Sequence, residues 1–119
     1  MSFKLLQSIT METIDLNTVR TSPDARIFSG RDSGRSARHK LHVERLERSG
    51  EHIVVRIPDD TIAVNLSFFL GLFGSSIQKM GETAFRKRYE FVSKPVHERS
   101  INEGIRKALL EGSVFDEGE

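Results

Sequence analysis

The chain of 119 residues contains no cysteine. This absence excludes disulfide bonds, zinc sites built from thiolates and a cysteine nucleophile. A composition without cysteine is also what a reducing compartment favours, and we therefore expect a cytoplasmic protein.

The sequence also lacks a long hydrophobic run. No segment approaches the ~18 consecutive apolar residues of a membrane-spanning helix. The opening residues, MSFKLLQSITMET, have one lysine and a short apolar stretch without a small-residue cleavage site. We therefore expect neither a secretory leader nor a membrane partner.

The chain also has no large excess of positive or negative charge. The 18 Lys and Arg residues nearly cancel the 17 Asp and Glu residues, so the overall charge does not identify a nucleic-acid-binding protein. A hydrophobic fraction of 37% is enough for one core, and 119 residues are too few for two. We predict a single domain over residues 1–112, followed by an acidic tail at residues 113–119 that is solvated and frayed.

Turn residues and hydrophobic spacing divide the chain into alternating strands and helices. Strands are predicted at residues 3–9, 13–19, 27–28, 52–57 and 88–93. Helices are predicted at residues 36–49, 66–80 and 100–111, the first ending at Gly50 and the last at Gly112. This order indicates an α/β fold, with α+β as the alternative, in which a small mixed sheet of about four to five strands carries helices mainly on one face. The β-branched segment 52–57 is expected at the centre of the sheet.

The predicted helix at residues 66–80 has two faces. Apolar residues at helical spacing form a core-facing stripe, namely Leu66, Phe69, Leu70, Phe73, Ile77 and Met80. Phe68 and Leu72 lie on the opposite side, where they form either a partner surface or a contact with a neighbouring loop. Gly71 and Gly74 lie between the two faces. Because glycine weakens a helix, we expect another backbone, from this chain or from a partner, to approach closely there.

The segment VNLSFFLGLFG, residues 64–74, carries Ser67-Phe68 and, further on, the sequence LFG. Upstream, residues 30–34 (GRDSG) are followed by Arg38. In these two segments and in the order of its elements, the chain resembles the STAS-like family of small bacterial domains of unknown function.

The resemblance implies a partner-switching function. In the wider STAS class, which includes anti-sigma-factor antagonists, a kinase-like ATPase phosphorylates a serine at the start of the second helix, and the added charge controls partner binding. The resemblance places that serine at Ser67. We assign the partner surface to Asn65, Phe68, Gly71 and Leu72. The simpler interpretation is that Asn65 and Ser67 only cap the helix.

A second hypothesis rests on the basic segment from Arg26 to Arg48. Its seven Lys and Arg residues outnumber three acidic residues. Four arginines of this segment could meet the phosphates of a nucleic acid or a nucleotide: Arg31, Arg35, Arg38 and Arg45. A solvated face is the favoured interpretation, and a nucleic-acid partner the less favoured one, because no aromatic residues are interleaved for base stacking.

Motifs for catalysis and cofactor binding are missing. The GRDSG segment has no Lys-Ser/Thr ending and is not a P-loop. His39 and His42 have a spacing that a metal could use, but the cations around them disfavour it. No nucleophile is paired with a base. We predict a non-catalytic interaction module without metal or cofactor, whose partner is another protein such as a kinase-like ATPase.

Overall fold

The computed structural model of the chain describes the backbone of residues 11–117 and the side chains of residues 11–112. The strand predicted at residues 3–9 lies outside the described residues.

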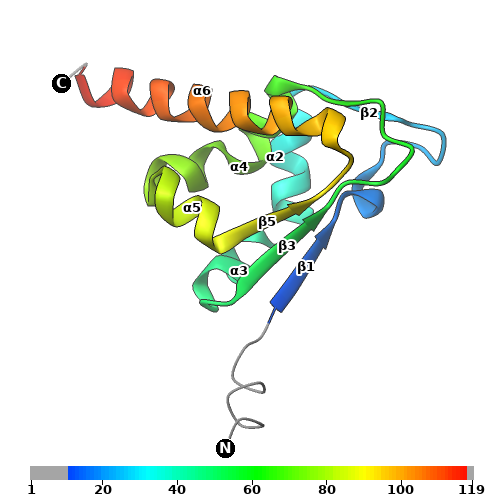
Figure 1. Cartoon of the computed structure of the whole chain (residues 1–119), viewed down its shortest axis with the longest axis horizontal. Helices are drawn as coiled ribbons and strands as arrows, with labels where there is room; N and C mark the ends of the chain where they lie inside the picture. Colours follow the sequence, from blue (N-terminus) through cyan, green and yellow to red (C-terminus); the bar gives the residue numbers. More distant parts are fainter. Residues whose placement is uncertain (1–10, 118–119) are drawn as a thin grey trace, which may run out of the picture.

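Two small parallel sheets form the β-structure of the described chain (Figure 1). The larger sheet holds β1 (Met11–Asp15), β3 (His52–Arg56) and β5 (Tyr89–Val92), in the order β1-β3-β5. The smaller sheet pairs β2 (Ile27–Phe28) with β4 (Ala63–Val64). The α/β class and the central place of β3 are confirmed, but the prediction of one mixed sheet is wrong. Each connection between paired strands passes through a helix, and such crossovers bring the strands back parallel.

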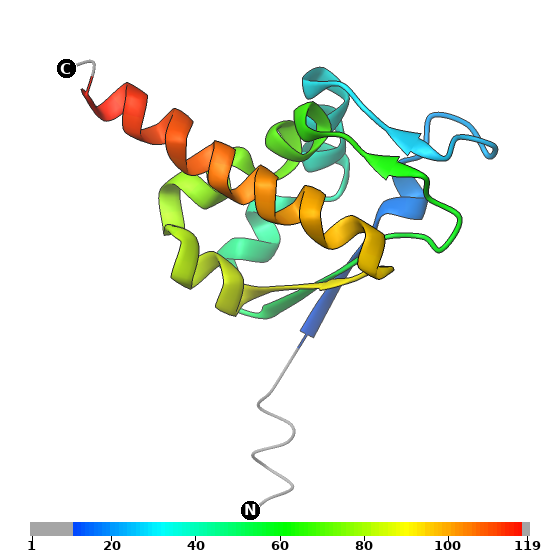
Figure 2. The same ribbon diagram turned by 45° about the horizontal axis from the view of Figure 1, so that its top comes forward.

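Helices cover one face of the three-stranded sheet (Figures 1 and 2). They are α2 (Arg31–Lys40), α3 (Val43–Arg48), α4 (Leu66–Met80), α5 (Glu82–Arg88) and α6 (Glu98–Glu117), with the 3-10 turns η1 (Leu16–Val19) and η2 (Pro95–His97). Ile53 and Val55 of β3 are buried, whereas Val54 between them is half-buried. This alternation agrees with helices packed mainly on one face.

Aromatic rings from α4, α5 and β5 form the centre of the core. The Phe73 ring lies 5.1 Å from Tyr89, 5.5 Å from Phe69 and 5.8 Å from Phe85, measured between ring centroids. Phe91 of β5 completes the cluster at 5.7 Å. All four of these Phe73 pairs meet edge to face, an arrangement that aromatic quadrupoles favour.

Helix α4 has the predicted bounds. Most of its predicted stripe is buried, namely Phe69, Leu70, Phe73 and Ile77. Met80 is half-buried, and Leu66 is exposed because it stands in the first turn, beyond the edge of the core.

The single helix predicted at residues 36–49 is two helices. It begins earlier, at Arg31, because Gly30 adopts a φ of 93° and turns the chain into α2. It is divided at His42, whose φ of 56° is left-handed and interrupts the helix before α3. Gly50, with a φ of 81°, follows the end of α3 as predicted. Helix α5 was not predicted, because its seven residues bury only Phe85.

The strand predicted at residues 13–19 ends at Asp15. The Asp15 carboxylate accepts a hydrogen bond from the Asn17 N–H at 2.9 Å and starts η1. At the other end of the chain, α6 begins at Glu98 and passes Gly112 to reach Glu117, through residues predicted as a frayed tail. A Cβ on Gly112 would lie 3.1 Å from the Gln78 Cγ, so this glycine lets α6 pack on α4 and does not end the helix.

The aromatic cluster can be tested at its centre. Phe73→Ala should lower the free energy of unfolding by about 3–5 kcal/mol, because it removes a buried ring that contacts several others. Val96→Ala, at an exposed position of η2, is the control and should change it by less than ~0.5 kcal/mol. Urea denaturation measures both, and near-wild-type stability of Phe73→Ala would contradict the packing described.

Candidate functional site

Two helices begin side by side at the end of the small sheet. β2 leads into α2 through Gly30, and β4 leads into α4 through Asn65, whose N–H donates to the Phe28 carbonyl at 2.8 Å. Because β2 and β4 are parallel, both helix N-termini lie at the same side of the sheet. The Gly30 N–H donates to the Ser67 Oγ at 3.0 Å and joins the start of α2 to the first turn of α4.

Asn65 and Ser67 are exposed at this junction. In the described structure, neither α2 nor α4 has a side-chain hydrogen bond at its N-cap. Asn65 takes the N-cap position of α4, as the capping interpretation predicts, but its side chain makes no capping hydrogen bond there, and the Ser67 hydroxyl contacts the neighbouring helix. The first-turn N–H groups of a helix lack intrahelical partners, so two positive helix ends lie beside one exposed hydroxyl.

The crossing of α2 and α4 depends on one pair of glycines. A Cβ on Gly71 would overlap the carbonyl oxygen of Arg31 and lie 2.9 Å from the Arg35 backbone nitrogen. A Cβ on Gly34 would overlap the carbonyl oxygen of Phe68. The close backbone approach predicted at Gly71 is confirmed, and the approaching backbone belongs to this chain, so Gly71 is not part of a partner surface. The same prediction for Gly74 is wrong, because a Cβ there would meet only side-chain atoms of Leu70, at 3.9 Å.

The expectation that Phe68 and Leu72 face a partner is wrong for the described chain. Their exposed fractions are 2% and 1%, because β2 and α2 cover this side of α4. The Phe68 ring lies 5.3 Å from the Phe28 ring, centroid to centroid. Substituting either residue would test the core and not a partner surface.

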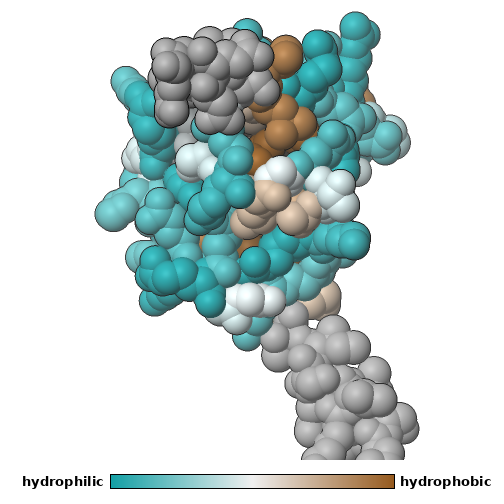
Figure 3. Space-filling model, turned by 90° about the vertical axis from the view of Figure 1, so that its left-hand side faces the viewer, coloured by the Kyte–Doolittle hydropathy of each residue, from teal (hydrophilic) through white to brown (hydrophobic). Residues whose placement is uncertain are grey.

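Exposed apolar side chains lie instead around the small sheet. Ile27 of β2, Ile62 just before β4 and Leu66 of α4 are large and exposed. The Ile62 N–H donates to the Arg26 carbonyl at 2.7 Å, and Ile27 pairs with Ala63, so two of these residues lie at the β2–β4 ladder. We call Ile27, Ile62 and Leu66 the apolar patch. The side of the molecule at the left of Figure 1 is, by contrast, mainly hydrophilic with one narrow apolar band (Figure 3).

The four arginines predicted to meet phosphates gather along one groove of about 700 Å³. Its walls carry Arg31, Arg35 and Arg38 from α2 and Arg45 from α3, together with Arg48 and two histidines. Its floor is α4, at Leu70, Gly71 and Gly74. We call this feature the basic groove.

Carboxylates of the chain neutralise part of the groove charge. Arg31 pairs with Glu111 at 3.1 Å and Arg35 pairs with Asp32. Among the described lining residues no Phe, Tyr or Trp occurs, so the groove lacks the large aromatic rings that usually stack on bases.

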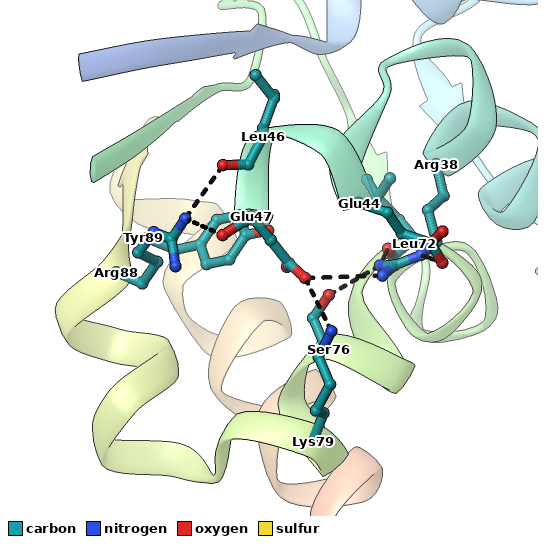
Figure 4. A network of polar contacts seen from close by, with 9 residues as sticks. All are labelled: Arg38, Glu44, Leu46, Glu47, Leu72, Ser76, Lys79, Arg88 and Tyr89. Carbon is teal, nitrogen blue, oxygen red and sulfur yellow. Dashed lines mark hydrogen bonds and ion pairs between the residues drawn. The ribbon is translucent and has the colours of Figure 1, made fainter. Parts of the chain in front are cut away.

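Arg38 differs from the other arginines of the basic groove because its side chain is nearly buried. Its guanidinium donates to the Leu72 carbonyl and to the Ser76 Oγ, each at 2.8 Å (Figure 4). It also lies 3.6 Å from Glu44 and 3.8 Å from Glu47. These contacts make Arg38 a structural link between α2, α3 and α4.

Glu47 is a buried charge that the sequence does not reveal. Its carboxylate accepts a hydrogen bond from the Tyr89 hydroxyl and lies 3.7 Å from the Lys79 Nζ (Figure 4). Burial, and then the hydrogen bond and charge of Glu47, raise the pKa of Tyr89 far above its ordinary value. The hydroxyl therefore stays protonated and donates. Helical spacing places Glu47, unlike Glu44, on the side of Val43 and Leu46, but its contact with Tyr89 depends on distant β5.

His39 and His42 both line the basic groove. Among the described residues, no three His, Cys, Asp or Glu side chains converge as a metal-binding group. Within the same part of the chain, no helix has both the length and the apolarity needed to span a bilayer. Comparison of the sequence with protein-family models and curated proteins, and of the structure with solved structures, finds no match.

The two central glycines of α4 should respond in opposite ways to alanine. Gly71→Ala should destabilise the fold by at least ~1–3 kcal/mol, because its methyl group meets the α2 backbone. Gly74→Ala should stabilise it by up to ~1 kcal/mol, because its methyl group meets no atom closer than 3.9 Å, an ordinary van der Waals contact, and alanine favours helix. Thermal and urea unfolding measure both variants, and equal effects would contradict the helix crossing.

The contacts between Arg38 and Glu47 can be tested with a second pair of substitutions. Arg38→Ala should cost about 1–3 kcal/mol, because it leaves the buried Glu47 short of a partner. Arg35→Ala should change stability by less than ~0.5 kcal/mol, because its pair with Asp32 is on the surface. Urea denaturation distinguishes them, and similar small losses for both would show that Arg38 is not structural.

Proposed function

We propose that this chain is a non-catalytic, STAS-like protein-interaction module, acting in the cytoplasm, whose partner binding is controlled by phosphorylation of Ser67. The observation that carries the proposal is the position of Ser67. Its hydroxyl is exposed where the N-termini of α2 and α4 meet.

The physical chemistry of this junction suits a phosphate. A phosphoserine carries about −1.5 to −2 charges. Uncapped N–H groups and the positive ends of two helix dipoles stabilise negative charge at such a place. The folded chain can therefore hold the modification without unfolding α4.

The apolar patch supports the interaction half of the proposal. Leu66 precedes Ser67 directly, Ile27 belongs to β2, and Ile62 lies just before β4, the two strands that lead into the helices. The patch replaces Phe68 and Leu72 as the partner surface, with exposed Asn65 at its edge. A phosphate beside it adds a charge that an apolar partner surface would have to desolvate, which opposes binding.

The partner is, on this proposal, another protein, with a kinase-like ATPase as the modifying enzyme that the STAS resemblance suggests. No catalytic residue and no cofactor are assigned. Nucleic acid remains the less favoured alternative, because the groove arginines Arg31, Arg35 and Arg38 pair with carboxylates and no Phe, Tyr or Trp accompanies them in the described groove.

The proposal predicts a difference between two substitutions of one side chain. Ser67→Asp should weaken retention of a native partner roughly tenfold or more, because it places a charge beside the apolar patch. Ser67→Ala should retain the partner. Immobilised variants exposed to extract of the source organism, with quantitative mass spectrometry, measure the change. Phosphopeptide mapping of the chain purified from that organism should find phosphate on Ser67.

Ser36→Asp is the matched control, because Ser36 is an exposed serine of α2 outside the junction and the basic groove. It should retain the partner like the unmodified chain. Equal retention by Ser67→Asp and by the unmodified chain would overturn the proposal, as would Ser67 free of phosphate under every growth condition.

A further inference from the structure

No contact within the fold explains why residue 74, in the middle of α4, is a glycine. Its φ is not left-handed, and a Cβ there would have its nearest neighbours, two atoms of Leu70, at 3.9 Å. By contrast, a Cβ on Gly34 or Gly71 would overlap the backbone of the facing helix. Glycine weakens a helix relative to alanine, so the fold by itself favours a side chain at Gly74. The missing side chain keeps the floor of the basic groove open.

The break at His42 brings further cations to this floor. Among the described residues, His42 alone has a positive φ without being a glycine, and such backbone strain is common at functional sites. The break lets α3 leave the direction of α2, so that Arg45 and Arg48 line the groove together with Arg31 and Arg35. Within the described chain, Arg45 and Arg48 have no carboxylate within 4.0 Å.

The acidic groups that line the groove or pair with its exposed arginines are weak competitors for an anion. Asp32 is 94% exposed and Glu44 is 70% exposed, and ion pairs in such positions contribute little. Glu111 holds Arg31 at the far wall, where both side chains are partly exposed. An incoming phosphate can therefore exchange with these carboxylates, since guanidinium groups bind phosphate oxygens in bidentate fashion.

We propose that the basic groove binds the diphosphate or triphosphate group of a small ligand, with Arg45 and Arg48 as the principal contacts and Gly74 as the open floor. A volume of about 700 Å³ lies within the range of small-molecule sites. The absence of Phe, Tyr and Trp among the described lining residues favours recognition of the phosphates over recognition of a base. The inference is independent of Ser67 and of its modification.

The test is isothermal titration of the full chain with sodium tripolyphosphate, with ATP and with a single-stranded oligonucleotide, at low ionic strength. Tripolyphosphate and ATP should both bind, more weakly as salt is added. The double variant Arg45→Ala/Arg48→Ala and the variant Gly74→Leu should each weaken binding roughly tenfold or more. Arg99→Ala removes an exposed arginine of α6 outside the groove and should leave binding unchanged.

The two phosphate probes identify the source of the ligand. Equal affinities support recognition of phosphate alone, and tighter binding of ATP supports a nucleotide. Thermal melting checks that each variant is folded, and Gly74→Ala repeats the test if Gly74→Leu does not fold. No binding of either probe, an equal loss in Arg99→Ala, wild-type affinity in a folded groove variant, or a preference for the oligonucleotide would overturn the proposal.

Discussion

The contact between the backbones of α2 and α4 at Gly34 and Gly71 is the constraint on which the rest of the structure depends. Because neither residue has a Cβ, the two helices approach until main-chain atoms touch. This approach buries Phe68 and Leu72 and brings both helix N-termini to one side of the small sheet. The same crossing leaves the following turn of α4 as the floor of the basic groove. Both candidate sites therefore follow from one crossing of two helices.

The polar network around Glu47 holds the remaining elements to that crossing. Glu47 sits on α3, receives a hydrogen bond from Tyr89 of β5 and lies near Arg38 of α2. A buried carboxylate is costly without partners, and the contacts from several elements offset that cost. Arg88 adds hydrogen bonds from the end of α5 to the Leu46 and Glu47 carbonyls, at 3.1 and 2.7 Å (Figure 4). The network fixes where α3 lies, and with it the wall of the groove.

The junction at Ser67 and the basic groove are different kinds of site on one pair of helices. At Ser67, two helix ends offer partial positive charge to a covalently attached phosphate, and exposed apolar residues lie next to it. In the groove, full charges on arginine side chains surround an open floor suited to a free ligand. The two proposals rest on different residues, so each proposal can fail without the other.

The sequence by itself determined the α/β class, the central strand β3, the bounds of α4 and the close approach at Gly71, because these depend on local periodicity and on residue types with few conformational options. Helical periodicity could not decide what covers the second face of α4. It shows only that Phe68 and Leu72 lie off the core-facing stripe. The packing of α2 and β2 against that face buries both residues. The burial of Glu47, the division at His42 and the gathering of the arginines likewise depend on contacts between residues distant in the chain. Tertiary structure decided these features because a side chain's environment is set by the elements that pack against it, and local sequence does not specify them.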